Sequence, residues 1–343
     1  MIEFLGRKFL QNIPAEIAHD ISIKMLASPA ASLIGSKTIE NPVELFGVNF
    51  PNPLGLAAGF DKNADAVHGL AKLGFGHIEV GTVTPKAQKG NPKPRLFRLP
   101  ENQAIINRMG FNNKGVDYLT AKIKKKPPNC ILGINIGKNK STANNKAIDD
   151  YSYCFNKAAA LADYITINIS SPNTQDLREL QESEKLIKLL RNLKQLQLDL
   201  QNTSKKYTPI VVKIAPDQEQ ELTSEIAKNI KKCQMDGIIC TNTTVNKNNL
   251  KKEIHQTETG GLSGKPLLSR SNETIKTVRK SVGTDFPIIG VGGILTGGDA
   301  MSKIAAGANL VQIFTGFIYR GSQLINDINY KLINNNKIHE SNR

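Results

Sequence analysis

Polar side chains close four successive apolar runs in the middle of the sequence. These residues are Asn135, Asn168, Lys213 and Asn242. An amide both donates and accepts hydrogen bonds, which suits a ligand ring carrying alternating carbonyl and N–H groups. A single asparagine at such a place is often only a turn residue, but the repetition favours a polar ligand site.

Glycines gather late in the chain, in the segments 260–264, 290–293 and 314–316. Loops after the seventh and eighth strands of an α/β barrel commonly bind phosphate through backbone N–H groups. No G-x-G-x-x-G motif follows an early strand, which argues against a tightly held dinucleotide. A phosphate site, Lys213 and the strand-end amides together suggest flavin mononucleotide (FMN), whose reduced, anionic ring the lysine would stabilise.

The segment 57–63 follows the first apolar run and combines small residues with a lysine, Lys62. Small residues let the backbone approach a flat ligand closely. Lys62 offers a point charge there, although a lone lysine is more often the solvated start of a helix.

Eight short apolar runs alternate with eight helical patterns from residue 53 onward. The runs cover 54–58, 76–81, 131–136, 164–169, 210–214, 237–240, 288–291 and 310–314, and the helical patterns cover 62–73, 112–125, 148–161, 182–198, 219–232, 268–281, 297–306 and 322–335. This alternation predicts a closed parallel (β/α)8 barrel of the TIM type, with a doubly wound open sheet as the alternative. The long connections 82–111 and 241–266 both follow a strand, so we expect them at the C-terminal mouth, where barrel active sites form.

Residues 1–40 form a separate unit of two short helices in front of the barrel, which occupies 41–343. Their apolar residues recur at helical spacing on either side of Pro14; they are Ile2, Leu5, Phe9 and Leu10, then Ile17, Ala18, Ile21, Met25 and Leu26. The pair caps one end of the barrel or dips into a membrane surface, and the periodicity alone leaves both open.

The composition excludes several classes of protein. The 343 residues are 39% hydrophobic and carry a net charge of +15, so a nucleic-acid or anionic-membrane partner is possible, although solvated lysines also explain the charge. The basic run from Lys86 to Arg98 could add attraction to anionic lipid.

No Cys or His spacing indicates a zinc or iron–sulfur site, so we expect no metal. No apolar run is long enough to span a bilayer.

Four segments resemble those of dihydroorotate dehydrogenases. They are NPLGLAAGFDK (52–62), NRMGFNN (107–113), NISSPNT (168–174) and GGLSGKPL (260–267). The likeness runs in order from about residue 14 to 325. It implies an FMN enzyme on a (β/α)8 barrel that oxidises dihydroorotate to orotate in pyrimidine (UMP) biosynthesis.

The resemblance also implies site residues. FMN is expected to contact Ala58, Gly59, Phe60, Asp61, Lys62, Thr82, Asn135, Asn168, Lys213, Thr241, Gly264, Gly293, Phe314 and Thr315. The substrate is expected to contact Lys62, Asn107, Arg108, Met109, Gly110, Phe111, Asn168, Asn173, Asn242 and Thr243.

In this family the base lies in the loop after the fourth strand, which here places Ser171 in that role. Soluble members carry Cys at this position and the quinone-linked class carries Ser. A serine needs a relay to remove the proton, and Thr174 or a water are the candidates.

The N-terminal helices also resemble the quinone-linked class, in which such a pair forms a quinone tunnel and rests on the membrane. His19 and Arg98 match residues that approach the quinone head in relatives, whereas Phe314 stands where many relatives have Tyr. We therefore expect a membrane quinone as acceptor and no iron–sulfur partner subunit. Because no mitochondrial targeting segment precedes the helices, we expect a peripheral protein on the cytoplasmic face of a bacterial cell membrane.

Three alternatives stay open. A soluble dihydroorotate dehydrogenase would use fumarate or NAD; Ser171 and the helical extension count against it. A flavin-dependent tRNA dihydrouridine synthase would suit the net charge but not the motif 168–174. A basic scaffold without enzymatic activity would not explain the polar residues at the strand ends.

Overall fold

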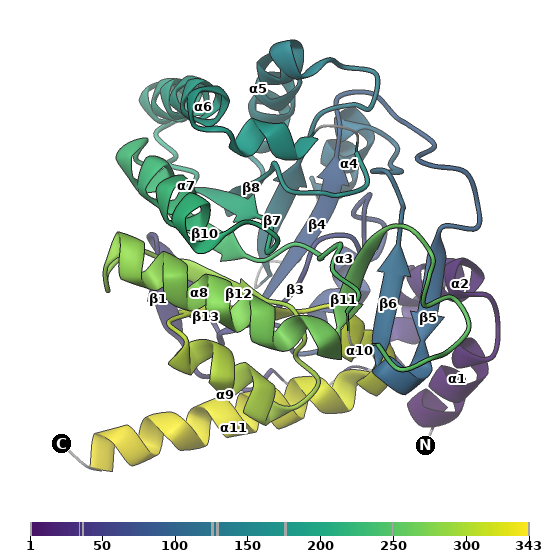
Figure 1. Ribbon diagram of the computed structural model, residues 1–343. Helices are drawn as coiled ribbons and strands as arrows, with labels where there is room; N and C mark the ends of the chain where they lie inside the picture. Colours follow the sequence, from purple (N-terminus) through teal and green to yellow (C-terminus); the bar gives the residue numbers. More distant parts are fainter. Residues whose placement is uncertain are drawn as a thin grey trace.

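Eight parallel strands form a closed barrel in the computed structural model, which describes residues 2–33, 35, 38–124, 127, 130–174, 177–248 and 250–341, with backbone alone for 2–5 and 335–341 (Figure 1). Around the barrel the strands are β3 (Leu54–Leu56), β4 (His77–Val83), β7 (Ile131–Ile136), β8 (Tyr164–Asn168), β9 (Ile210–Ile214), β10 (Gly237–Cys240), β12 (Ile288–Val291) and β13 (Leu310–Ile313). All eight fall on the predicted runs, and closure rules out the open sheet.

Helices follow the strands and form the outer ring. They are α3 (Val67–Ala71), α4 (Val116–Ile123), α5 (Ala147–Ala158), α6 (Ser183–Ser204), α7 (Gln220–Lys232), α8 (Leu268–Val282), α9 (Gly297–Ala305), α10 (Thr315–Arg320) and α11 (Ser322–Ser341), with short 3-10 turns η2 (Pro100–Asn102), η3 (Asn144–Lys146), η4 (Leu177–Gln181) and η5 (Lys265–Leu267). The helix predicted over 62–73 is shorter than expected. The Asp61 carboxylate accepts backbone N–H groups from Asn63, Asp65 and Ala66 and holds a turn there, so the helix begins only at Val67.

The strands are buried on both faces because helices cover the outside and side chains fill the inside. All residues of β4, β8 and β9 are buried. The inner layer is partly polar: Glu79 accepts hydrogen bonds from Asn135 (2.8 Å), Tyr164 (3.2 Å) and Gln312 (2.9 Å), so its buried carboxylate is satisfied.

A hairpin that the sequence patterns did not predict closes the N-terminal end of the barrel. Strands β1 (Val43–Leu45) and β2 (Val48–Phe50) pair antiparallel. Phe50 is fully buried and its ring packs edge-on against His77, with centroids 5.2 Å apart. Apolar burial at this end leaves the opposite, C-terminal end as the open one.

The two long connections form a small sheet rather than irregular loops. Strands β5 (Leu96–Leu99), β6 (Ala104–Asn107) and β11 (Gly261–Gly264) are antiparallel in the order β11-β6-β5. Strand β11 belongs to the second connection and pairs with β6 of the first. Together they build a wall at the C-terminal mouth.

The N-terminal helices α1 (Ile2–Gln11) and α2 (Ala15–Ala27) lie beside this wall, followed by the turn η1 (Pro29–Leu33) (Figure 1). Pro14 separates them, as predicted. Arg95 of the first connection pairs with Glu16 of α2 at 2.7 Å, and Arg98 of β5 donates to the Leu10 carbonyl oxygen at 2.8 Å and to that of Ile13. The helices are therefore fixed to the wall by charged hydrogen bonds.

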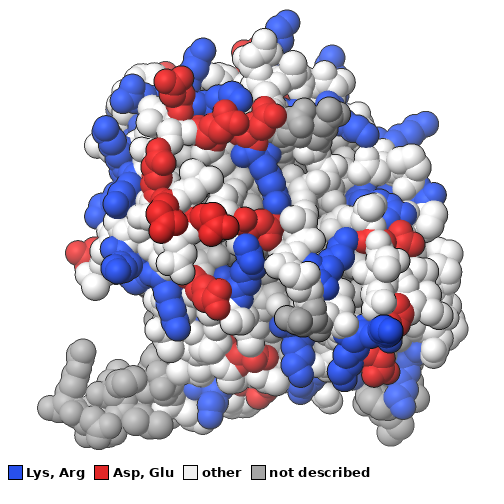
Figure 2. Space-filling view, viewed as in Figure 1, with Lys and Arg blue, Asp and Glu red and all other residues white. Residues whose placement is uncertain are grey.

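The charges of the surface are mixed. Basic and acidic side chains are interspersed over the face shown in Figure 2. Within the basic run 86–98, Lys86 and Lys89 are exposed, but Arg95 is buried on Glu16 and Arg98 is turned inward. The expected attraction of that run to lipid is therefore weaker than its sequence indicates. In the described part of the chain, no helix is long and apolar enough to cross a membrane.

Candidate active site and hydrophobic tunnel

A cavity of about 380 Å³ lies between the C-terminal ends of the barrel strands and the N-terminal helices. Its inner end is formed by strand-end residues and its outer end by α1, α2, β5 and α10. Predicted residues that line it are Ala58, Gly59, Phe60, Lys62, Thr82, Asn107, Met109, Gly110, Phe111, Asn168, Ser171, Asn173, Lys213, Thr241, Asn242, Thr243, Gly264, Gly293, Phe314 and Thr315, together with His19 and Arg98. Residues from nearly the whole chain thus meet at one cavity.

Three residues that were predicted to contact a ligand do not line the cavity; they are Asp61, Asn135 and Arg108. The Asp61 carboxylate is occupied by backbone N–H groups, as described above. Asn135 is fully buried and its amide oxygen accepts from Thr82 Oγ1 at 2.5 Å. The Arg108 side chain turns away to Glu258 at 2.7 Å. Asn135 thereby holds Thr82, which lines the cavity, and direct ligand contact by these three residues stays a prediction.

Lys213 reaches the cavity from β9 and is 6% exposed. No described residue accepts a hydrogen bond from its ammonium group. Burial lowers its pKa, and the nearby Glu79 carboxylate opposes that shift. A buried ammonium group is costly without a hydrogen-bond acceptor, so Lys213 is placed to bind an acceptor on a ligand.

Gly264 and Gly293 bring the main chain to the lining of the inner part of the cavity. A Cβ at Gly264 (φ +98°) would lie 2.3 Å from the Gln103 carbonyl oxygen, and one at Gly293 (φ +81°) would lie 2.5 Å from the Leu268 backbone. Only glycine fits either position. Glycine therefore lets the main chain pack closely at both positions, and binding of a phosphate by the backbone N–H groups stays a prediction.

Amide side chains form two hydrogen-bonded groups on the polar side of the cavity. Asn168 Nδ2 donates to Thr82 Oγ1 (2.9 Å), and Asn242 Nδ2 donates to Asn168 Oδ1 (3.3 Å) and to Ser170 Oγ (3.1 Å). Asn173 Nδ2 donates to Asn107 Oδ1 at 2.9 Å. These hydrogen bonds fix the orientation of each amide. The amides therefore present a defined set of donors and acceptors to the cavity.

Ser171 lies among these amides and is 5% exposed. Its Oγ accepts the Asn173 backbone N–H at 3.3 Å, and no described residue accepts a hydrogen bond from it. Thr174 is also buried, but no hydrogen bond joins its side chain to Ser171. The Ser171 hydroxyl is therefore available to a ligand, and the relay through Thr174 is not formed in this arrangement.

The outer end of the cavity is apolar. Phe60 packs edge-on against Phe314, Phe317 and the His19 ring, with centroids 6.2, 5.3 and 5.4 Å apart. Burial and, to a smaller extent, the Lys62 cation lower the pKa of His19 to about 3, so the ring is neutral at pH 7. Such a lining suits an apolar ring or chain.

A family model described as dihydroorotate dehydrogenase matches residues 41–335. The chain belongs to the dihydroorotate dehydrogenase family. It is 51% identical to the dihydroorotate dehydrogenase (quinone) of Saccharophagus degradans, with 93% of this chain and 95% of that protein covered. It is 50% identical to that of Dechloromonas aromatica over 337 residues, 96% of each chain.

Solved structures agree with this membership. The DHODH of Eimeria tenella in complex with ferulenol matches with a TM-score of 0.88 and 38% identity, over 93% of this chain and 90% of that one. The alignment with the Dechloromonas dehydrogenase is longer than the barrel segment 41–343, so the likeness includes part of the N-terminal helical pair. These relatives therefore match part of the N-terminal helical pair as well as the barrel.

Sequence patterns missed several residues of this dehydrogenase fold that shape the cavity. Leu96 and Ile105 line it from β5 and β6, and β6 also pairs with β11, which is distant in sequence. Ser263 of β11 also lines it and accepts from Thr315 Oγ1 at 2.8 Å. It lies inside the motif 260–267, so that motif could have indicated it, whereas no local signal marks Leu96 or Ile105.

Proposed function

We propose that the protein oxidises (S)-dihydroorotate to orotate at this cavity, with FMN as cofactor and a membrane quinone as electron acceptor. The observation that carries the proposal is a single cavity with two different ends. Amides, Ser171 and Lys213 surround its inner end, and Phe60, Phe314 and Phe317 form its outer end. The first end suits a charged pyrimidine and the second suits a quinone.

The residues of the inner cavity fit FMN. Gly264 and Gly293 would receive the phosphate, and Lys213 would contact the pyrimidine edge of the flavin ring. Gly59, Thr82 and Asn168 would hold the middle of the cofactor, supported from behind by Asp61 and Asn135. When bound, FMN would supply the acceptor for the hydride of dihydroorotate carbon 6 and a route for two electrons to the quinone.

Ser171 takes the proton from carbon 5, and the double bond between carbons 5 and 6 of orotate forms as the hydride leaves. The proton must pass on to solvent, because a serine hydroxyl is a poor base by itself. Asn107, Asn173 and Asn242 would hold the ring amides of the substrate, and Lys62 its carboxylate. Burial and, to a smaller extent, the Arg95 cation lower the pKa of Lys62 to about 8, so the ammonium group is charged at pH 7.

Residues 1–40 serve as the quinone tunnel and membrane contact, and 41–343 as the FMN-binding barrel. Large apolar side chains of the helices face outward; Phe9, Ile17 and Leu33 are 63%, 53% and 77% exposed. Their burial in lipid would place the outer end of the cavity at the bilayer, where quinone dissolves. The proposed location is the cytoplasmic face of a bacterial cell membrane, with His19 and Arg98 toward the quinone head.

Cofactor release tests the chemistry of the inner cavity. Purified holoprotein should show flavin absorbance, bleach on anaerobic addition of dihydroorotate, and release about one FMN per chain on denaturation. Release of FAD, or no flavin after reconstitution with FMN, would contradict the proposal.

A further inference from the structure

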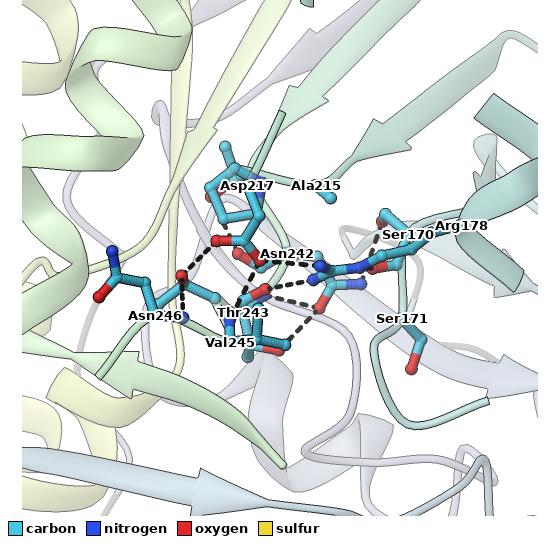
Figure 3. A network of polar contacts seen from close by, with 12 residues as sticks. Ser170, Ser171, Arg178, Ala215, Asp217, Asn242, Thr243, Val245 and Asn246 are labelled. Carbon is cyan, nitrogen blue, oxygen red and sulfur yellow. Dashed lines mark hydrogen bonds and ion pairs between the residues drawn. The ribbon is translucent and has the colours of Figure 1, made fainter. Parts of the chain in front are cut away.

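The loop that carries Ser171 is held by an arginine that does not reach the cavity. Arg178 lies in η4, eight residues after Ser170, and folds back over the loop (Figure 3). Its Nε donates to the Ser170 carbonyl oxygen at 3.3 Å, and its Nη2 donates to that of Thr243 at 3.2 Å. One guanidinium group therefore bridges the peptide before the proposed base and a peptide of the substrate-binding segment after β10.

The third arm of the guanidinium group binds Asp217, in the loop after β9, with Nη1 and Oδ2 2.8 Å apart. The same carboxylate accepts the Val245 backbone N–H at 3.0 Å and the Thr244 hydroxyl (Figure 3). Asp217 thereby fixes the continuation of the segment that contains Asn242 and Thr243. The Arg178 and Asp217 side chains are 24% and 12% exposed, so solvent screens this pair less than a surface ion pair.

We propose that Arg178 and Asp217 act together as a positioning pair for Ser171, which rests on the proposed role of Ser171 as the base. Neither residue lines the cavity, so neither touches the substrate. Their contacts instead set where the Ser170–Ser171 peptide lies relative to Asn242 and Thr243. The pair thus fixes the distance between the serine hydroxyl and the carbon that it deprotonates.

The geometry requires an arginine. A planar guanidinium group donates along three directions at once, here to Ser170, Thr243 and Asp217, whereas a lysine offers a point charge that cannot maintain this fork. Asp217→Asn keeps the size of the side chain but removes the charge that orients Arg178. Arg178→Lys and Asp217→Asn should therefore each move the loop that carries Ser171 by a fraction of an ångström. Misplacement of a reacting group by about 1 Å typically costs about 100-fold in rate.

The test is stopped-flow reduction of the flavin in holoprotein under anaerobic conditions, at saturating dihydroorotate. We expect Arg178→Lys and Asp217→Asn each to lower the first-order rate constant by about 10- to 100-fold. Orotate affinity, from the spectral shift of the oxidised flavin, should change by less than about threefold, because the amides that hold the ring remain. The double variant should be little slower than either single variant, because the two residues act as one unit.

This rate constant separates positioning from stability, because only molecules that retain flavin contribute to it. Lys185→Gln is the matched control: it breaks the exposed pair of Lys185 with Glu182 (2.8 Å) just beyond η4 and should leave the rate unchanged. Unchanged rates in Arg178→Lys and Asp217→Asn beside a slow Ser171→Ala would overturn the positioning pair alone. A full rate in Ser171→Ala would instead overturn the base on which it rests.

Discussion

Burial lowers the pKa of both lysines of the cavity, Lys62 and Lys213, but the two residues have different proposed roles. The ammonium group of Lys62 donates to the Gly59 carbonyl oxygen at 2.7 Å and stands near the mouth, with a pKa of about 8. Lys213 lies deeper, where Glu79 favours its charged form. Because its pKa is about 8, Lys62 gains or loses its charge near neutral pH. We assign Lys213 to the flavin.

The low pKa of Lys62 predicts a pH dependence of ligand binding. A lysine whose pKa is lowered is charged below that value and neutral above it, so orotate should bind with constant affinity below about pH 8. Affinity should fall by up to about tenfold per pH unit above it. Lys62→Gln should bind weakly with no such step. Flavin spectral titrations between pH 7 and 9 measure this, and a step that persists in Lys62→Gln would assign it to another group.

Substitution of Ser171 tests the base itself. Ser171→Ala should slow flavin reduction by about 100-fold or more, the usual scale for a general base, while orotate binding stays close to normal. Ser171→Cys should retain part of the activity, and its pH profile should move toward the lower pKa of a thiol. Unchanged reduction in Ser171→Ala would contradict the assignment.

At the scale of elements, the hydrophobic pattern of the sequence predicted the barrel strands, because local sequence determines them. Continuous apolar runs such as 131–136 marked each barrel strand, because both faces of the strand are buried. The sheet β5–β6–β11 escaped prediction, since β11 contains two glycines and a serine and pairs with residues more than 150 positions away. The bonds of Asn135 could not be predicted for a related reason: its amide turns toward Glu79 and Thr82, which only the folded barrel reveals.

The N-terminal helices give the prediction at this scale. Ile17→Asp with Ile21→Asp places charge on the exposed face of α2, where these side chains are 53% and 41% exposed. Binding to vesicles and reduction of a long-tailed quinone should fall at least tenfold, because apolar burial carries the docking. Flavin reduction by dihydroorotate should not change, because neither residue lines the cavity.

Leu222→Asp is the matched control for these substitutions. Leu222 is 39% exposed on α7, across the molecule from α1 and α2 (Figure 1). Vesicle binding should be unchanged in this variant. Equal loss in the control, or no loss in the α2 variant, would show that the helices only cap the barrel.

At the scale of the whole molecule, the net charge of +15 does not make the face shown in Figure 2 uniformly basic. Charges of both signs alternate on the face in Figure 2, and Arg95 and Arg98 are directed to the protein interior. The sequence alone could not reveal this, because it counts charges without their partners. Membrane contact is therefore expected to depend on apolar side chains more than on lipid charge.

Salt should accordingly have little effect on membrane binding. Raising the salt concentration from about 0.1 M to 1 M shortens the Debye length from about 10 Å to about 3 Å and screens exposed charges. Binding to vesicles that contain anionic lipid should persist under these conditions. A loss of more than about tenfold would indicate that lysines such as Lys86 and Lys89 carry the docking instead.

The choice of electron acceptor tests the central proposal most directly. Holoprotein reduced anaerobically with dihydroorotate should be reoxidised rapidly by a quinone in detergent or vesicles, and at least 100-fold more slowly by fumarate or NAD, because only a quinone suits the tunnel of Phe60, Phe314 and Phe317. Rapid reoxidation by fumarate or NAD with no response to quinone, or a flavin that dihydroorotate does not reduce, would contradict it.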